Sequence, residues 1–193
     1  MNHTATLLPD TNVLVVGGFS GRQNAALANA FIYDAATGQW AAVRPMPRSL
    51  MQHTATLLLD GRVLVAGGAS EPFGPAQSRA CIYDPTSDSW ELSEMCVPRK
   101  GHSATRLATG QVLVVGDSAM SNPGNARTAE LYDPLSGQWA LTAQMPYGRF
   151  GHSASCLPTG EVLVAGGARP VSHPAPVSST EIYTLAQANC QRG

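Results

Sequence analysis

The chain has 193 residues, of which only 13% are charged, and its formal net charge is −1. A chain this close to neutral lacks the basic footprint that phosphate-driven binding to nucleic acid requires. Its apolar stretches are short, as at residues 13–16, whereas a membrane-spanning helix needs about 20 apolar residues. Residues 1–20 contain no basic segment followed by an apolar core, so we predict no signal peptide within this chain.

Four related segments follow one another along the chain. Each opens with a histidine and a small hydroxyl residue, and continues into an apolar run that ends in glycine. The four openings are His3-Thr, His53-Thr, His102-Ser and His152-Ser. A period of about 50 residues is typical of an array of small supersecondary units. We therefore predict one domain over residues 1–193, with units at about 1–47, 48–96, 97–146 and 147–193.

The second unit illustrates the predicted elements in chain order. Residues 53–58 alternate small polar and apolar side chains, which favours a strand. Asp60-Gly61 is a hairpin turn signal, and the apolar run 63–66 predicts a strand buried on both faces. After a glycine pair and a variable loop at 69–79, a third strand is expected at 80–84 and a fourth from Trp90 to Met95. Four short strands joined by tight turns are typical of one blade of a β-propeller.

The unit resembles the kelch repeat, because an apolar strand ends in Gly-Gly and is followed by Tyr-Asp and then by tryptophan. In the second unit these residues are Gly67-Gly68, Tyr83-Asp84 and Trp90. The form is similar to kelch repeats of bacterial secreted proteins and of the propeller in galactose-oxidase-like proteins. The resemblance covers essentially the whole chain and implies an all-β kelch propeller of four units, each with four strands. It implies no particular activity, because a fold does not determine function.

The fourth unit departs from this pattern, because no tryptophan follows Tyr183. We therefore expect the last unit to lack its fourth strand. Three explanations stay open: a fragment of a larger propeller, a closed four-bladed ring, or assembly with a second copy into a larger ring. An unpaired strand invites pairing with another chain, so self-association through an open blade edge is expected. In the third unit Asp117 replaces the second glycine; we expect it to adopt the left-handed conformation, with an acidic ligand residue as the alternative.

The repeated residues have two competing interpretations. Pseudo-symmetry would place the four histidines at matching positions around one axis, and imidazole rings bind transition metals. A residue that recurs in every unit is better explained by a packing role that recurs in every unit, so we predict that each imidazole hydrogen-bonds a neighbouring turn and that there is no metal site. The same reasoning assigns the repeated tyrosine, tryptophan and methionine to the core, and the aspartate after each tyrosine to capping the next turn.

The enzymatic interpretation requires a copper site. Galactose-oxidase-like enzymes use tyrosine and histidine ligands with a tyrosine crosslinked to cysteine, and the resemblance offers no such set outside the repeated positions. The cysteines Cys81, Cys96, Cys156 and Cys190 show no paired spacing. No nucleophile motif, metalloprotease motif or phosphate loop occurs either. We therefore predict no enzymatic activity and no cofactor.

The unrepeated loops between the second and third strands are the remaining candidates for function, since loops on a rigid scaffold carry binding residues. These loops emerge on one face of a propeller, and arginine and aromatic side chains are frequent interface anchors. The candidate binding residues are Arg22, Phe73, Met120, Asn122, Arg169 and His173.

The leading hypothesis is thus a non-enzymatic scaffold that recognises a protein or a glycan through this loop face. The alternatives are a partial or non-catalytic propeller of a secreted galactose-oxidase-like or carbohydrate-active protein, and a structural module of a larger surface protein. The compartment is left open, with an extracellular location expected only for a fragment of a secreted kelch protein.

Overall fold

A computed structural model describes residues 1–118, 124–171 and 174–184 of the chain. These residues form an all-β structure whose only helical element is a short 3-10 turn, η1 (Asn125–Arg127). No helix among them has the length and hydrophobicity needed to cross a membrane.

Four antiparallel sheets account for the four units. The first contains β1 (Thr4–Leu7), β2 (Val13–Val16), β5 (Ala30–Asp34) and β6 (Gln39–Val43). The second contains β7 (Thr54–Leu57), β8 (Val63–Ala66), β9 (Gln77–Asp84) and β10 (Ser89–Arg99). The third contains β11 (Ser103–Arg106), β12 (Val112–Val115), β13 (Ala129–Asp133) and β14 (Gln138–Leu141). The fourth sheet, as described, contains β15 (Ser153–Cys156), β16 (Val162–Ala165) and β17 (Thr180–Tyr183).

The same register recurs in every sheet, because the same residues set it. The second strand pairs with the first through a tight turn, and a glycine near the end of that turn has positive φ in units two to four: Gly61, Gly110 and Gly160. In the first unit Thr11 takes this conformation instead. In the first three units the third and fourth strands place tyrosine opposite tryptophan, as in the pair Tyr83–Trp90.

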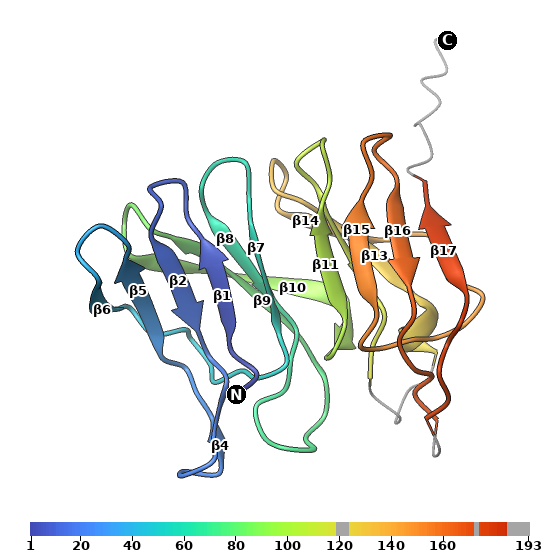
Figure 1. The fold of residues 1–193 in the computed structure, drawn as a ribbon, viewed down its shortest axis with the longest axis horizontal. Helices are drawn as coiled ribbons and strands as arrows, with labels where there is room; N and C mark the ends of the chain where they lie inside the picture. The colour runs from blue at the N-terminus through green and yellow to red at the C-terminus, as the bar shows by residue number, and fades with distance from the viewer. Residues whose placement is uncertain (119–123, 172–173, 185–193) are drawn as a thin grey trace.

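The sheets stand side by side in sequence order, from the first unit at the left of Figure 1 to the fourth at the right. Their first strands are neighbours: β1 contacts β7, β7 contacts β11, and β11 contacts β15. Three hydrophobic clusters fill the spaces between successive sheets. In the first cluster, Leu14 and Val16 of one sheet pack with Val63 and Val65 of the next. The second and third sheets therefore each contribute one face to each of two neighbouring clusters, whereas the first and fourth sheets each contribute to one.

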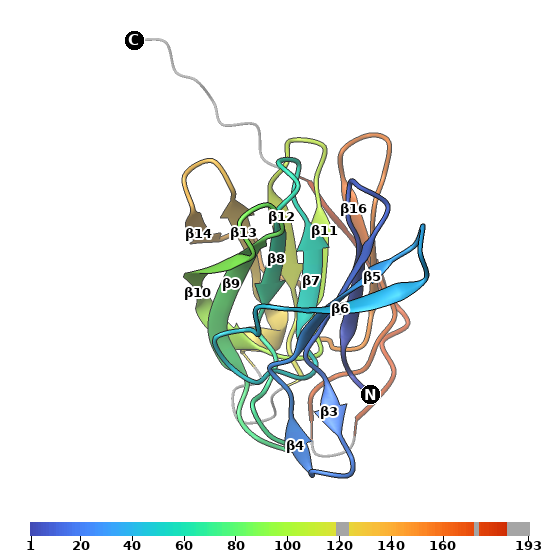
Figure 2. The same ribbon diagram turned by 90° about the vertical axis from the view of Figure 1, so that its left-hand side faces the viewer.

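The strands predicted from the second unit are confirmed, although β9 and β10 extend beyond the expected bounds. The prediction of an all-β kelch-type repeat fold is therefore confirmed at the level of four-stranded antiparallel sheets. Sequence reasoning missed the small hairpin of β3 (Phe19–Ser20) and β4 (Ala25–Ala26), which projects below the first sheet in Figure 2. It also missed η1. Closure into a ring, the number of blades and the single domain over residues 1–193 stay predictions.

Candidate functional site

One edge of the array carries the loops that differ most between units. The β3–β4 hairpin, residues 69–76 and residues 174–176 lie along this edge, at the bottom of Figure 1. Isolated bridges join the loops of adjacent segments: Leu27 with Leu50, Met51 with Ala69, and Phe150 with Ala168. A small apolar cluster of Phe19, Ala26, Met51 and Ala69 packs the β3–β4 hairpin against the segments that contain Met51 and Ala69. We call this surface the loop edge, and its backbone is anchored although its side chains vary.

Phe73 is the most prominent side chain of the loop edge. It is fully solvent-exposed, at 104% of its reference area, and its φ is +60°. Left-handed backbone is unfavourable for a bulky residue, and exposing an aromatic ring forgoes its burial energy. The loop is nevertheless fixed, because Lys100 Nζ donates to Gly74 O at 2.7 Å and Gly74 N donates to Glu71 O at 3.1 Å. The fold therefore holds an aromatic side chain in solvent at a local conformational cost.

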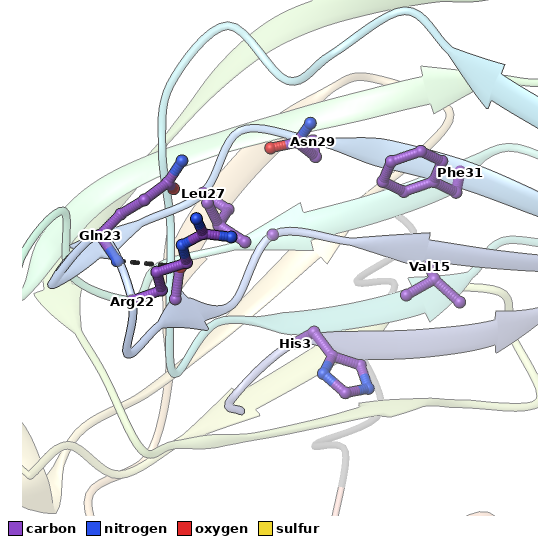
Figure 3. A pocket seen from close by; sticks show the side chains of 9 residues that line it. His3, Val15, Arg22, Gln23, Leu27, Asn29 and Phe31 are labelled. Atoms are coloured by element: carbon purple, nitrogen blue, oxygen red, sulfur yellow. Dashed lines mark hydrogen bonds between the residues drawn. The ribbon is translucent and has the colours of Figure 1, made fainter.

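Arg22 borders a shallow hollow of about 650 Å³ on the first unit. Figure 3 shows the neighbouring side chains of this hollow, including His3 before β1, Val15 on β2 and Phe31 on β5. The hairpin tip that presents Arg22 is held by Gln23 N, which donates to Ser20 Oγ at 3.3 Å. Arg22 itself is exposed and available to a ligand.

Arg169 lies at the other end of the loop edge, on the fourth unit. Its guanidinium carbon is 4.3 Å from the centre of the half-exposed Tyr147 ring, an arrangement that favours a cation–π interaction. Met120, Asn122 and His173 lie outside the described residues. The structure thus places Arg22, Phe73 and Arg169 on three different units along one edge, and no contact joins them into a single pocket. Sequence reasoning missed Tyr147, whose only signal was its position in a loop before a first strand.

Three of the repeated histidines are engaged in the junctions between units. The ring Nε2 of His53, of His102 and of His152 shares a hydrogen bond with the hydroxyl residue that follows the histidine of the preceding unit. The pairs are Thr4 with His53 at 2.9 Å, Thr54 with His102 at 2.9 Å and Ser103 with His152 at 2.8 Å. The prediction of a structural role is confirmed, but the partner is a side chain at the start of a strand and not a turn. The sequence shows that a threonine or serine follows each histidine. It does not show that this hydroxyl pairs with the histidine of the next unit.

Burial controls the protonation of these rings. It lowers the pKa of His53 to about 4, with the nearby His3 as a smaller cause. It lowers the pKa of His102 to about 3, helped by the charge of Arg99, and that of His152 to about 4. Desolvation disfavours the charged imidazolium in each case. At neutral pH these three rings are therefore uncharged members of the junctions between units.

Two buried arginines join the end of one sheet to the next. Arg99 Nε donates to Glu130 Oε1 at 2.8 Å, and both side chains are fully buried. Its Nη1 also donates to Gly116 O at 3.0 Å and to Thr128 O at 2.9 Å. Arg149 repeats the arrangement with Gly166 O and Glu181. These arginines are structural and unavailable to a ligand.

The other repeated residues follow the predicted roles with two exceptions. Met46, Met95 and Met145 are buried, and the aspartates after tyrosine accept hydrogen bonds from the following turns. The indoles of Trp90 and Trp139 donate to the preceding unit. Trp40, however, is 60% exposed, because no described unit covers its face. Asp117 does not adopt positive φ as predicted; it is buried, and its Oδ1 accepts from Lys100 N at 3.0 Å.

Within the described residues, no group of three or more histidine, cysteine, aspartate or glutamate side chains is arranged to hold a metal ion. A family model for the Kelch motif matches residues 3–47, which is the first unit. Comparison with curated proteins found no match. The second and third units repeat the characteristic residues and the four-stranded layout of the first, and the fourth repeats its first three strands within the described residues.

Proposed function

We propose that this kelch-repeat protein is a non-catalytic scaffold that binds a protein partner through its loop edge. The single observation that carries the proposal is Phe73, a fully exposed aromatic ring held at φ +60° by an anchored loop. Backbone strain of this kind persists where the surrounding structure imposes it, and it clusters at functional positions. Buried aromatic anchors dominate the affinity of protein interfaces.

The chemistry of the edge supports a protein partner. Besides Phe73 on the second unit, the first unit carries the exposed Arg22 and the fourth unit carries the stacked Arg169–Tyr147 pair. Aromatic residues and arginine are enriched at protein interfaces, whereas lysine and glutamate are depleted. His53, His102, His152 and the buried arginines are engaged in the junctions, so we assign binding specificity to the residues that differ between units.

Site-specific photo-crosslinking tests this proposal. A photoreactive phenylalanine analogue replaces Phe73 in one variant and Leu135 in the control, because Leu135 is 98% exposed but follows β13, in the turn that ends at Gln138. Irradiation in an extract of the cells that produce the protein should give a discrete, protease-sensitive adduct at position 73 and none at position 135.

The same experiment can contradict the proposal. Equal labelling at the two positions would show nonspecific capture, and no adduct at position 73 would remove the role assigned to this ring. An adduct that is sensitive to glycosidases but resistant to proteases would replace the protein partner by a glycan.

A further inference from the structure

Each of the three junctions between described units is built from the same three contacts. At each junction the residue before the histidine has positive φ, and its N–H donates to the carbonyl of the equivalent residue one unit earlier. The pairs are Gln52 to Asn2 at 3.3 Å, Gly101 to Gln52 at 3.2 Å, and Gly151 to Gly101 at 3.1 Å. The imidazole then shares a hydrogen bond with the hydroxyl of the preceding unit.

The third contact is a socket for the imidazole. A Cβ added at Gly17 would lie 2.7 Å from His53 Cε1, and one at Gly67 would lie 2.7 Å from His102 Cε1. Gly116 and His152 show the same distance of 2.7 Å. The first glycine of the repeated pair therefore makes room for the histidine of the next unit.

The first unit presents one half of this junction with no partner in the described part of the chain. Neither the Asn2 N–H nor the His3 ring has a hydrogen bond among the described residues. Leu7 is 62% exposed, whereas its counterpart Leu57 packs into the cluster between the first two sheets. Trp40 is likewise exposed where Trp90 is packed.

The fourth unit presents the other half. A Cβ at Gly166 would meet nothing within 4 Å, so this socket is open. The Ser153 hydroxyl reaches only Ala165 O, at 3.4 Å, and no described residue donates to Gly151 O. Ile182 is 59% exposed, whereas Ile82 is buried between sheets. The first-unit face therefore carries the groups that the fourth-unit face lacks as partners, and the fourth-unit face carries those that the first-unit face lacks.

We propose that the first-unit face and the fourth-unit face bind each other between two copies of this chain. Figure 1 shows the two faces at opposite ends of an open array, so they do not meet within one copy. In the complex, Asn2 N–H donates to Gly151 O, His3 pairs with Ser153, and its ring enters the Gly166 socket. Two copies satisfy both faces of each other around a two-fold axis, which closes the assembly. The eight units of this ring fall within the four to eight blades of natural propellers.

Two single-face variants test this head-to-tail contact. Leu7→Arg places a charge on the first-unit face, and Ile182→Arg places one on the fourth-unit face. Light scattering after size exclusion should give the wild type at twice the chain mass of 20.2 kDa and each variant at the single-chain mass. An equimolar mixture of the two variants should return to twice the chain mass, because each supplies the face that the other lacks.

The exposed Leu135 gives a matched control, since Leu135→Arg adds the same charge away from both faces and should behave as the wild type. If Leu7→Arg fails to fold by circular dichroism, Trp40→Arg changes the same face. A wild type that stays at one chain mass over a concentration series, a mixture that stays monomeric, or a ladder of larger species would overturn the two-copy ring. These outcomes concern the end faces and leave the crosslinking result at Phe73 unaffected.

Discussion

Arg99 and Glu130 form a buried ion pair that the second unit replaces with apolar side chains. Leu50 stands at the position of Arg99 and Cys81 at that of Glu130, and both pack in one hydrophobic cluster. Burial raises the pKa of Cys81 to about 12, so its thiol stays neutral. The same two positions of the repeat thus hold an apolar pair in the second unit and an ion pair in the third. A buried ion pair is not intrinsically more stabilising than a well-packed apolar one.

We expect Arg99→Leu alone to lower the free energy of unfolding by about 3–5 kcal/mol, because it leaves Glu130 buried without its partner. The double change Arg99→Leu with Glu130→Cys, copied from the second unit, should cost less than the single change. Arg149→Leu is the matched comparison and should cost less than Arg99→Leu, since Glu181 is partly exposed. Urea denaturation of the variants measures these differences. A double variant less stable than Arg99→Leu would contradict the pairing.

The buried histidines make stability depend on pH. In the unfolded chain a histidine has a pKa near 6.5, whereas the folded values for His53, His102 and His152 are about 4, about 3 and about 4. Between these values the unfolded state binds more protons, so stability rises with pH. The contribution is complete above pH 6.5 and is lost as the pH falls toward 4.

The free energy of unfolding should therefore decrease from pH 6.5 to pH 5, above the range in which most carboxylates titrate. Urea denaturation at several pH values measures the slope. His102→Gln removes one of the three titrating rings and should make that slope shallower, whatever its effect on stability at pH 7. An unchanged slope in this variant would show that His102 binds as many protons in the folded state as in the unfolded chain over this range, which contradicts its lowered pKa.

At the scale of the element, the first glycine after the second strand forms part of the junction in the first three units, at Gly17, Gly67 and Gly116. Gly67 has φ +65° and faces Arg99 O, His102 and Met95, whereas Gly166 has φ +71° and nothing nearby. Alanine at either position meets the same backbone strain, of about 1–2 kcal/mol. Only at Gly67 does the added methyl group also collide with the next unit.

Gly67→Ala should therefore lower the free energy of unfolding by about 1–3 kcal/mol more than Gly166→Ala, which is the typical cost of overpacking. Both variants are best compared in the Leu7→Arg background, where we expect a single chain and an empty Gly166 socket. Thermal unfolding followed by circular dichroism gives the comparison. Equal losses at the two positions would mean that the imidazole can move aside.

Much of each unit could be predicted from its sequence, because strand positions follow the apolar runs and the turn glycines. The hydrogen bonds of His53 and His102 could not be predicted, because they join residues about one repeat apart whose relation depends on how the sheets stack. The β3–β4 hairpin was missed since its strands have two residues each. Asp117 was assigned the wrong conformation because its burial against Lys100 N arises only in the tertiary structure.

For the whole molecule, repeated and unrepeated residues have separate roles. The repeated ones build the junctions, and among residues 1–118, 124–171 and 174–184 the same junction contacts have no partner at either end of the array. The unrepeated ones lie along the loop edge, where Phe73 and Arg22 are exposed on an anchored backbone. Under the two proposals made above, the loop edge binds a partner and the two end faces bind another copy.

Binding of the crosslinked partner to Phe73→Ala, measured by calorimetry, tests the central claim most directly. We predict an affinity at least about tenfold weaker than that of the wild type, as for an interface anchor, with an unchanged melting temperature because the ring is fully exposed. Leu135→Ala, the matched control, should bind as the wild type does. Wild-type affinity in Phe73→Ala would contradict the assignment of the loop edge as the binding surface.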